Sequence, residues 1–149
     1  MAGGCLVCTQ CWTDHHRSAS GLMLRIDEHR WMKAGIEYVD GMSRVSCVVT
    51  NSFSDWSTQN WSSPSLHIRA HRINGNDVVV EFRGSETEPW TMIRIAHFHD
   101  RDGSTITDKT PVQAGAYIAC PAKTADKFYT DFHKVRISQG GREFHHSAE

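Results

Sequence analysis

Residues 21–50 read GLMLRIDEHRWMKAGIEYVDGMSRVSCVVT. Apolar residues recur at every second position of its first part, as at Leu22, Leu24 and Ile26, and the pattern resumes at Met32. A period of two is typical of β-strands that bury one face and leave the other to solvent. The stretch therefore predicts three antiparallel strands that share one apolar face.

The dipeptide Asp-Gly at residues 40–41 predicts a tight hairpin between the second and third strands, because a type I′ turn needs residues that tolerate positive φ. A two-residue turn places Ile36 opposite Val45 on the apolar face. It also places Glu37 opposite Arg44 on the other face, where the charges attract. A shift of the strand pairing by one residue would place charged side chains in the core. The apolar pattern and the turn therefore predict the same pairing register.

The first hairpin of the stretch has two loop lengths that keep the apolar residues on one face. A loop of five residues would set Arg25 against Lys33, and a loop of three, residues 27–29, would set Arg25 against Trp31. A guanidinium and an indole ring attract each other, whereas two cations repel. The three-residue loop is therefore the prediction.

Residues 21–41, with VVT at 48–50 and FSDWS at 53–57, resemble the "regulation of enolase protein" family, a domain of unknown function in the concanavalin A-like lectin/glucanase superfamily. The likeness extends weakly to about residue 137. It implies a jelly-roll-like β-sandwich without an assigned catalytic role, and the family name implies control of a glycolytic enzyme. Family members carry further strands upstream of Gly21, so the resemblance also implies a fold that is incomplete at its N-terminus.

Composition narrows the choice of function. A chain of 149 residues is long enough for one domain with an ordinary core. A net charge of -1 argues against nucleic acid or an anionic membrane as the partner. No apolar run approaches the roughly 20 residues of a membrane span, and no secretory signal is evident, so a cytoplasmic protein is expected. The odd count of five cysteines argues against a disulfide framework, and Cys47 is expected to behave as a small apolar residue.

The chain divides into three parts on its pattern. Residues 1–20 have little apolar periodicity and are expected to be poorly ordered, residues 21–138 form the sandwich, and residues 139–149 are a polar tail. Within the sandwich, residues 52–65 are rich in serine and asparagine and are expected to form a loop that exposes Trp56 and Trp61.

Two further strands, residues 66–73 and 77–83, are predicted on either side of the turn Asn-Gly-Asn. A three-residue loop there sets Arg69 opposite Glu81 on the outer face and places Ile68 in the core. Opposite charges again meet across the pair.

Three more strands are predicted, at residues 90–98, 112–120 and 128–137. Ile93 and Ile95 are expected on one side of the first. In the last, the apolar positions change parity, which predicts a β-bulge near His133 or Lys134. About eight short strands without a helical period indicate an all-β antiparallel sandwich.

The predicted ligand-binding residues are Arg25, Trp31, Lys33, Glu37, Trp56 and Arg69. All but Trp56 are expected on one outer face of the central sheet, and Trp56 is expected in the loop beside that face. Flat aromatic rings cover the apolar faces of sugars, and charged groups bond their hydroxyls, so carbohydrate or a similar polar ligand is the first hypothesis. A regulatory protein-interaction module is the second. A third interpretation is an ordinary solvated face crossed by weak ion pairs.

Neither catalysis nor a bound cofactor is predicted. Glycosidases need two carboxylates roughly 5 to 10 Å apart, and here Glu37 and Glu81 each stand alone on their strands. Two groups carry incomplete metal-binding patterns. His97 and His99 lie two positions apart, and the run Cys5, Cys8 and Cys11 has the spacing of part of an iron–sulfur or zinc site without a fourth cysteine.

Overall fold

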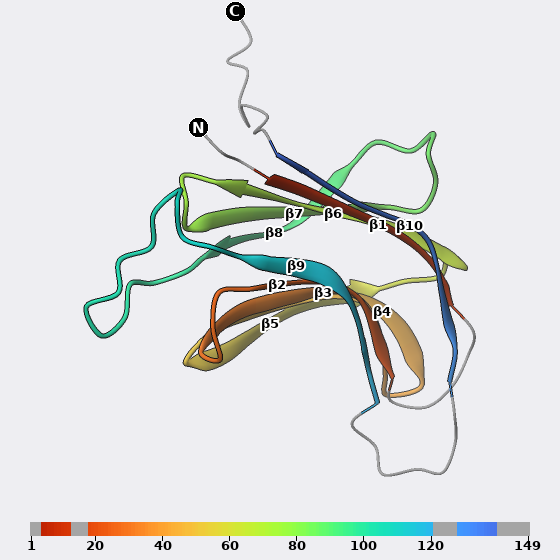
Figure 1. Ribbon diagram of the computed structural model, residues 1–149. Helices are drawn as coiled ribbons and strands as arrows, with labels where there is room; N and C mark the ends of the chain where they lie inside the picture. Colours follow the sequence, from red (N-terminus) through yellow and green to blue (C-terminus); the bar gives the residue numbers. More distant parts are fainter. Residues whose placement is uncertain (1–3, 13–17, 121–127, 140–149) are drawn as a thin grey trace, which may run out of the picture.

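The computed structural model describes residues 4–12, 18–120 and 128–139. In these residues it has ten strands, no helix, and two five-stranded antiparallel sheets that face each other (Figure 1). Sheet A contains, in spatial order, β10 (Thr130–Gln139), β1 (Gly4–Trp12), β6 (Ser65–Ile73), β7 (Asp77–Arg83) and β8 (Thr91–His97). Sheet B contains β5 (Phe53–Asn60), β4 (Met42–Asn51), β3 (Arg30–Val39), β2 (Ala19–Arg25) and β9 (Gln113–Ala119). The predicted all-β sandwich is confirmed.

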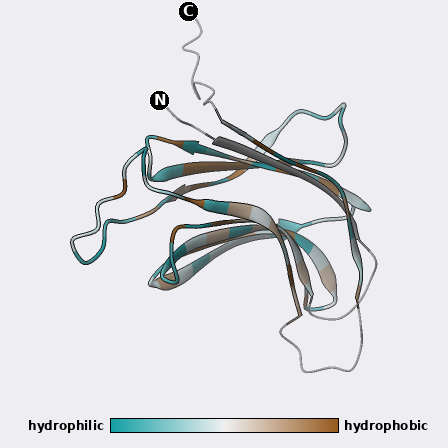
Figure 2. Cartoon of the chain, in the orientation of Figure 1, coloured by the Kyte–Doolittle hydropathy of each residue, from teal (hydrophilic) through white to brown (hydrophobic). Residues whose placement is uncertain are grey.

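The core lies between the two sheets. Its fully buried side chains include Leu22, Met32 and Ile36 from sheet B and Ile68 and Val80 from sheet A. Figure 2 shows apolar and polar positions alternating along the strands of sheet B. Burial of this apolar surface is the main force that holds the sheets together.

Cys47 belongs to this core and is fully buried. Burial raises the pKa of its thiol to about 12, because a thiolate there would lose its hydration. The prediction that Cys47 behaves as a small apolar residue is confirmed.

The predicted hairpin registers are also confirmed. Ile36 lies opposite Val45, and the turn residues Asp40 and Gly41 have φ of 53° and 78°. The three-residue loop at 27–29 sets Arg25 opposite Trp31.

Strand β1 corrects the prediction for residues 1–20. Residues 4–12 form a strand between β10 and β6, at the interior of sheet A, and residues 18–20 are buried at the start of β2. Valine, threonine and tryptophan favour strands, although the segment has little apolar periodicity. Residues 1–3, 13–17 and 140–149 lie outside the described residues, so the polar tail stays a prediction.

Strand β5 corrects the prediction of a loop at residues 52–65. Residues 53–60 pair along β4, from Phe53 opposite Asn51 to Asn60 opposite Arg44. The strand lies at the edge of sheet B and is mostly exposed, so its composition is polar like that of a loop.

Two bulges shift the strands of sheet A. In β10, Thr9 and Gln10 pair with Lys134 and Phe132, which leaves His133 as the extra residue and confirms the predicted bulge. In β8, an unpredicted bulge lies at Ile93. Ile93 therefore packs against the core while Ile95 is 55% exposed, and the prediction that they share a side was wrong.

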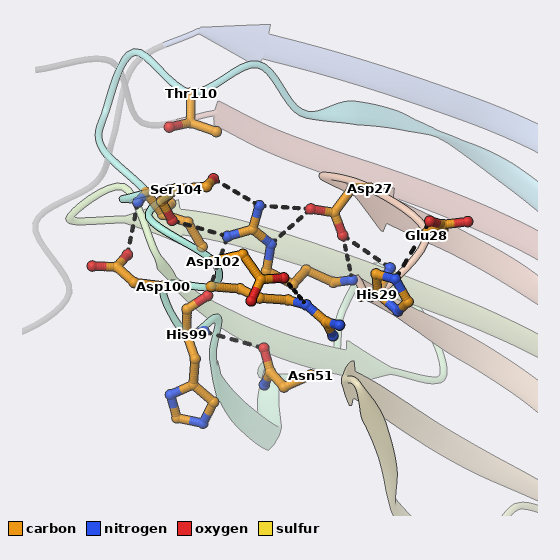
Figure 3. Close-up of polar contacts among 12 residues, drawn as sticks. Asp27, Glu28, His29, Asn51, His99, Asp100, Asp102, Ser104 and Thr110 are labelled. Atoms are coloured by element: carbon orange, nitrogen blue, oxygen red, sulfur yellow. Dashed lines mark hydrogen bonds and ion pairs between the residues drawn. The ribbon is translucent and has the colours of Figure 1, made fainter.

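A buried arginine ties two loops together at one end of the sandwich. Arg30, which is 6% exposed, donates from Nε and Nη2 to the carboxylate of Asp27 at 2.8 and 2.6 Å. Its Nη1 donates to the backbone carbonyls of His99 and Ser104, each at 3.3 Å (Figure 3). One guanidinium thus joins the β2–β3 loop to the connection between β8 and β9.

Candidate ligand-binding face

Five of the six predicted ligand-binding residues share the outer face of sheet B. These are Arg25, Trp31, Lys33, Glu37 and Trp56. Their strand neighbours, such as Met32 and Ala34, point into the core, and side chains alternate between the two faces. Lys33 and Trp56 occupy one row across the sheet, separated by Val48.

The sixth residue, Arg69, lies in β6 of sheet A, so its prediction as part of the same surface was wrong. Its Nε donates to Glu81 at 2.5 Å, and its guanidinium stacks on the Trp90 ring at 4.2 Å. The alternation of side chains along the strand correctly predicted that Arg69 faces outward. A sandwich has two outward faces, however, and alternation along one strand does not indicate which sheet the strand joins.

Paired glycines shape the middle of the face. Gly21 of β2 lies opposite Gly35 of β3. A Cβ atom on Gly35 would lie 1.9 Å from the carbonyl oxygen of Ser20, and one on Gly21 would lie 2.1 Å from that of Ala34. The two strands therefore approach too closely for any side chain at this row. Figure 1 shows β4 and β9 bending at one end, with the outer face of sheet B on the inside of the bend.

Lys33 and Glu37 flank Gly35 on the same strand. Lys33 Nζ bonds Glu37 Oε1 at 2.8 Å, and their side chains are only 23% and 11% exposed. The ammonium also lies 5.6 Å from the centre of the Tyr117 ring, which β9 contributes next to Gly21. An ion pair that is largely shielded from solvent interacts more strongly than a surface pair, and it loses more hydration.

Two polar residues of this face were missed by the sequence interpretation. Ser46 lies beside Gly35 on β4, and Tyr117 lies beside Gly21 on β9. Their hydroxyl oxygens are buried, and neither has a hydrogen-bond partner in the described part of the chain. Burial raises the pKa of Tyr117, and the nearby charge of Glu37 adds to the increase. Alternation along β4 could have placed Ser46 on this face, but Tyr117 required the pairing of β2 with β9.

Three tryptophans divide between the outer face and the core: Trp31 and Trp56 lie on the outer face of sheet B, and Trp61 packs against the core. Trp31 is half-buried on β3, and Trp56 is 47% exposed on β5. The backbones of these strands are roughly 10 Å apart, since one strand lies between them. Trp61 instead packs edge-on against Phe82, with 5.5 Å between ring centres, so the expected exposure of Trp61 was wrong.

Among residues 18–120 and 128–139, no group of three or more histidine, cysteine or acidic side chains is placed to hold a metal ion. The rings of His97 and His99 lie 5.2 Å apart, and His97 Nδ1 bonds the Asp77 carboxylate at 2.5 Å. The side chains of Cys5, Cys8 and Cys11 lie outside the described residues, so that prediction stays open. Likewise, no helix of the described residues is long and apolar enough to cross a membrane.

Two facing antiparallel sheets with a bent outer face define a concanavalin A-like β-sandwich. Residues 6–140 match the family model described as "protein of unknown function (DUF1349)". The chain therefore belongs to this family. The matched segment includes residues 6–20, which were expected to lie outside the fold.

Two similar proteins come from Saccharomyces cerevisiae. "Regulation of enolase protein 1" is 36% identical over 84 residues, which are 56% of this chain and 42% of that protein. The crystal structure of a functionally unknown protein has a TM-score of 0.71 and 25% identity, and the match covers 93% of this chain and 70% of that chain. The match thus spans less than half the length of regulation of enolase protein 1.

A part of each of two larger glycoside hydrolase-related proteins shares the same fold at low identity. The xylan β-1,4-xylosidase of Bacillus halodurans has a TM-score of 0.73 at 12% identity, over 91% of this chain and 27% of the enzyme. The GH43 BlXynB protein of Bacillus licheniformis gives 0.70 at 13%, with the same coverage. At this identity the likeness shows the fold alone.

Proposed function

We propose that the outer face of sheet B binds carbohydrate and that the domain is a non-catalytic binding module. The observation that carries this proposal is the group of polar side chains beside Gly35 on the outer face of sheet B, which Trp31 shares on β3 and Trp56 shares in the row of Lys33. Aromatic rings at these two positions offer flat apolar surface for the C–H faces of sugar rings. On the same face, Lys33 offers a donor and Glu37 an acceptor for sugar hydroxyls.

The carboxylates of this face support a binding role without catalysis. Glu37 is the one acid that the described strands of sheet B place on their outer face, since Asp55 lies opposite Val49 in a core-facing row. Glycoside hydrolysis requires two carboxyl groups roughly 5 to 10 Å apart. One acid paired to a lysine does not provide them.

A glycan array tests the proposal. We expect the wild-type chain to bind a subset of oligosaccharides and Trp31→Ala to lose at least about tenfold in affinity, because stacking area and orientation are lost together. Trp90→Ala is the matched control, since Trp90 stacks on Arg69 and Arg83 at the other sheet. No glycan signal from folded wild-type protein, or equal loss in both variants, would reject the proposal.

A specific observation favours a protein-interaction module as the second candidate. Apolar side chains are exposed along β9 and β10, including Ile118 at 58% and Ile137 at 60%. Both occupy core-facing rows, as Ile118 lies opposite Ser20 and Ile137 shares the row of Ala70. Exposed apolar surface of this kind is typical of protein contacts.

The name of the yeast relative supplies the partner to test. Titration calorimetry with purified enolase should show binding that Ile137→Lys weakens and Trp31→Ala does not, if this candidate is correct. Binding to enolase without any glycan signal would favour it over the first. A cytoplasmic location is part of both proposals and stays a prediction.

A further inference from the structure

Two buried hydroxyls on the outer face of sheet B have no hydrogen-bond partner in the part of the chain that the structure describes. They are Ser46 Oγ and Tyr117 Oη, and Ser46 is only 1% exposed. A buried polar atom without a partner lowers stability, so most such atoms in folded proteins are paired. Serine and tyrosine are easily replaced by alanine and phenylalanine at no cost in packing, so the presence of both hydroxyls requires another reason.

These hydroxyls lie next to the Lys33–Glu37 ion pair. Ser46 is opposite Gly35, between the two charged residues of β3, and Lys33 Nζ lies 5.6 Å from the Tyr117 ring. Gly35, which carries no side chain, lies between Lys33 and Glu37 on β3. Four polar groups from β3, β4 and β9 therefore converge on the glycine row.

The four groups have complementary chemistry. The Lys33 ammonium only donates hydrogen bonds, the Glu37 carboxylate only accepts them, and the two hydroxyls do both. An anionic ligand group would meet the carboxylate of Glu37 at close range, which disfavours it. A pair of adjacent sugar hydroxyls suits the set, because each hydroxyl can donate one bond and accept another.

We propose that Lys33, Glu37, Ser46 and Tyr117 recognise two neighbouring hydroxyls of a neutral sugar ring, an inference that rests on the proposed carbohydrate function. One ligand hydroxyl donates to Glu37, and the other accepts from Lys33. Ser46 and Tyr117 gain partners. The flexible side chain of Lys33 must move before a ligand can reach the buried hydroxyls of Ser46 and Tyr117, so Lys33 controls access to them. Ser46 and Tyr117 are then the residues that set specificity.

The test compares Tyr117→Phe and Ser46→Ala with wild type on an array of neutral, uronic-acid and sulfated oligosaccharides. We expect neutral glycans to bind and each variant to weaken that binding by about tenfold, as one hydrogen bond to a buried group is lost. Mild periodate, which cleaves the carbon–carbon bond between adjacent hydroxyls, should abolish the signal.

Unfolding measurements separate recognition from structure. Each variant removes an unpaired buried oxygen, so we expect thermal midpoints equal to or above that of wild type. A marked loss of stability would assign the hydroxyls a structural role and overturn the inference. Preference for acidic glycans, or unchanged binding by both variants alongside loss in Trp31→Ala, would overturn it and leave the proposed function in place. Absence of all glycan binding would reject both.

Discussion

Gly35→Ala is expected to be the most destabilising of the substitutions considered for this domain. The new methyl group would lie 1.9 Å from the Ser20 carbonyl oxygen and 2.7 Å from the Gly21 Cα, closer than atoms of these kinds ever approach. These neighbours are backbone atoms of an interior strand and cannot turn aside as a flexible side chain could. Overpacking of this kind costs about 3 kcal/mol in free energy of unfolding. Urea denaturation followed by far-UV circular dichroism measures the loss.

Gly115→Ala is the matched control for that experiment. Gly115 lies in β9 of the same sheet, and a Cβ atom there would meet nothing within 4 Å. We expect this variant to stay within about 0.5 kcal/mol of wild type. Equal denaturation midpoints for the two alanine variants would show that β2 and β3 do not require their close approach.

Arg30→Gln is expected to be the second most damaging change. The guanidinium is buried and makes hydrogen bonds to Asp27, to the His99 carbonyl and to Ser104 (Figure 3). Glutamine is shorter and uncharged, so it leaves backbone carbonyls without donors and releases the loop of residues 98–110. The expected cost is about 3 kcal/mol in free energy of unfolding, since charge-assisted bonds to a buried group are lost.

The control for Arg30 is Arg101→Gln at the same end of the molecule. Arg101 Nε bonds the adjacent Asp102 at 2.9 Å and its Nη1 donates to Ser52 Oγ, and both contacts are exposed to solvent. Surface pairs of this type contribute about 0.5 kcal/mol or less. Comparable losses in the two variants would contradict the assignment of Arg30 as the tie between the loops.

Stability should also depend on pH through Asp27. Partial burial raises the pKa of this carboxyl. Hydrogen bonds from the Arg30 side chain and from the His29 and Arg30 backbone together lower the pKa by more than burial raises it, so the net pKa lies below its ordinary value. An acid with a lowered pKa stabilises the fold above its unfolded pKa of about 3.9, and this contribution is lost as pH falls through the folded value. Arg30→Gln should therefore flatten the dependence of unfolding free energy on pH below about pH 4. An unchanged acid slope would reject the link.

Local pattern was sufficient for the hairpins and for one bulge. Ile36 opposite Val45, and Arg25 opposite Trp31, follow from alternation and turn chemistry within about 25 residues. The bulge at His133 follows from a change of parity inside one strand. The bulge at Ile93 has no such sign, because isoleucine at 93 and 95 matches regular alternation.

Neighbours distant in sequence explain the remaining errors. β1 is a strand because β6 and β10 pair with it on both sides, and β5 has its register from β4. Neither segment has an apolar alternation strong enough to indicate pairing. Propensity within a strand is weak compared with the cross-strand contacts that a sheet provides.

Which residues face outward is thus a property of each strand, because side chains alternate between the two faces along it, as they do in the strand that contains Leu22 and in the strand that contains Phe82. Which outward residues share one surface is a property of the folded sheets. Arg69 separates from Lys33 because β6 and β3 join different sheets, and Tyr117 meets Lys33 because β9 pairs with β2. Side-chain parity is set by the backbone of two or three residues, whereas strand order results from burying both apolar faces in one core.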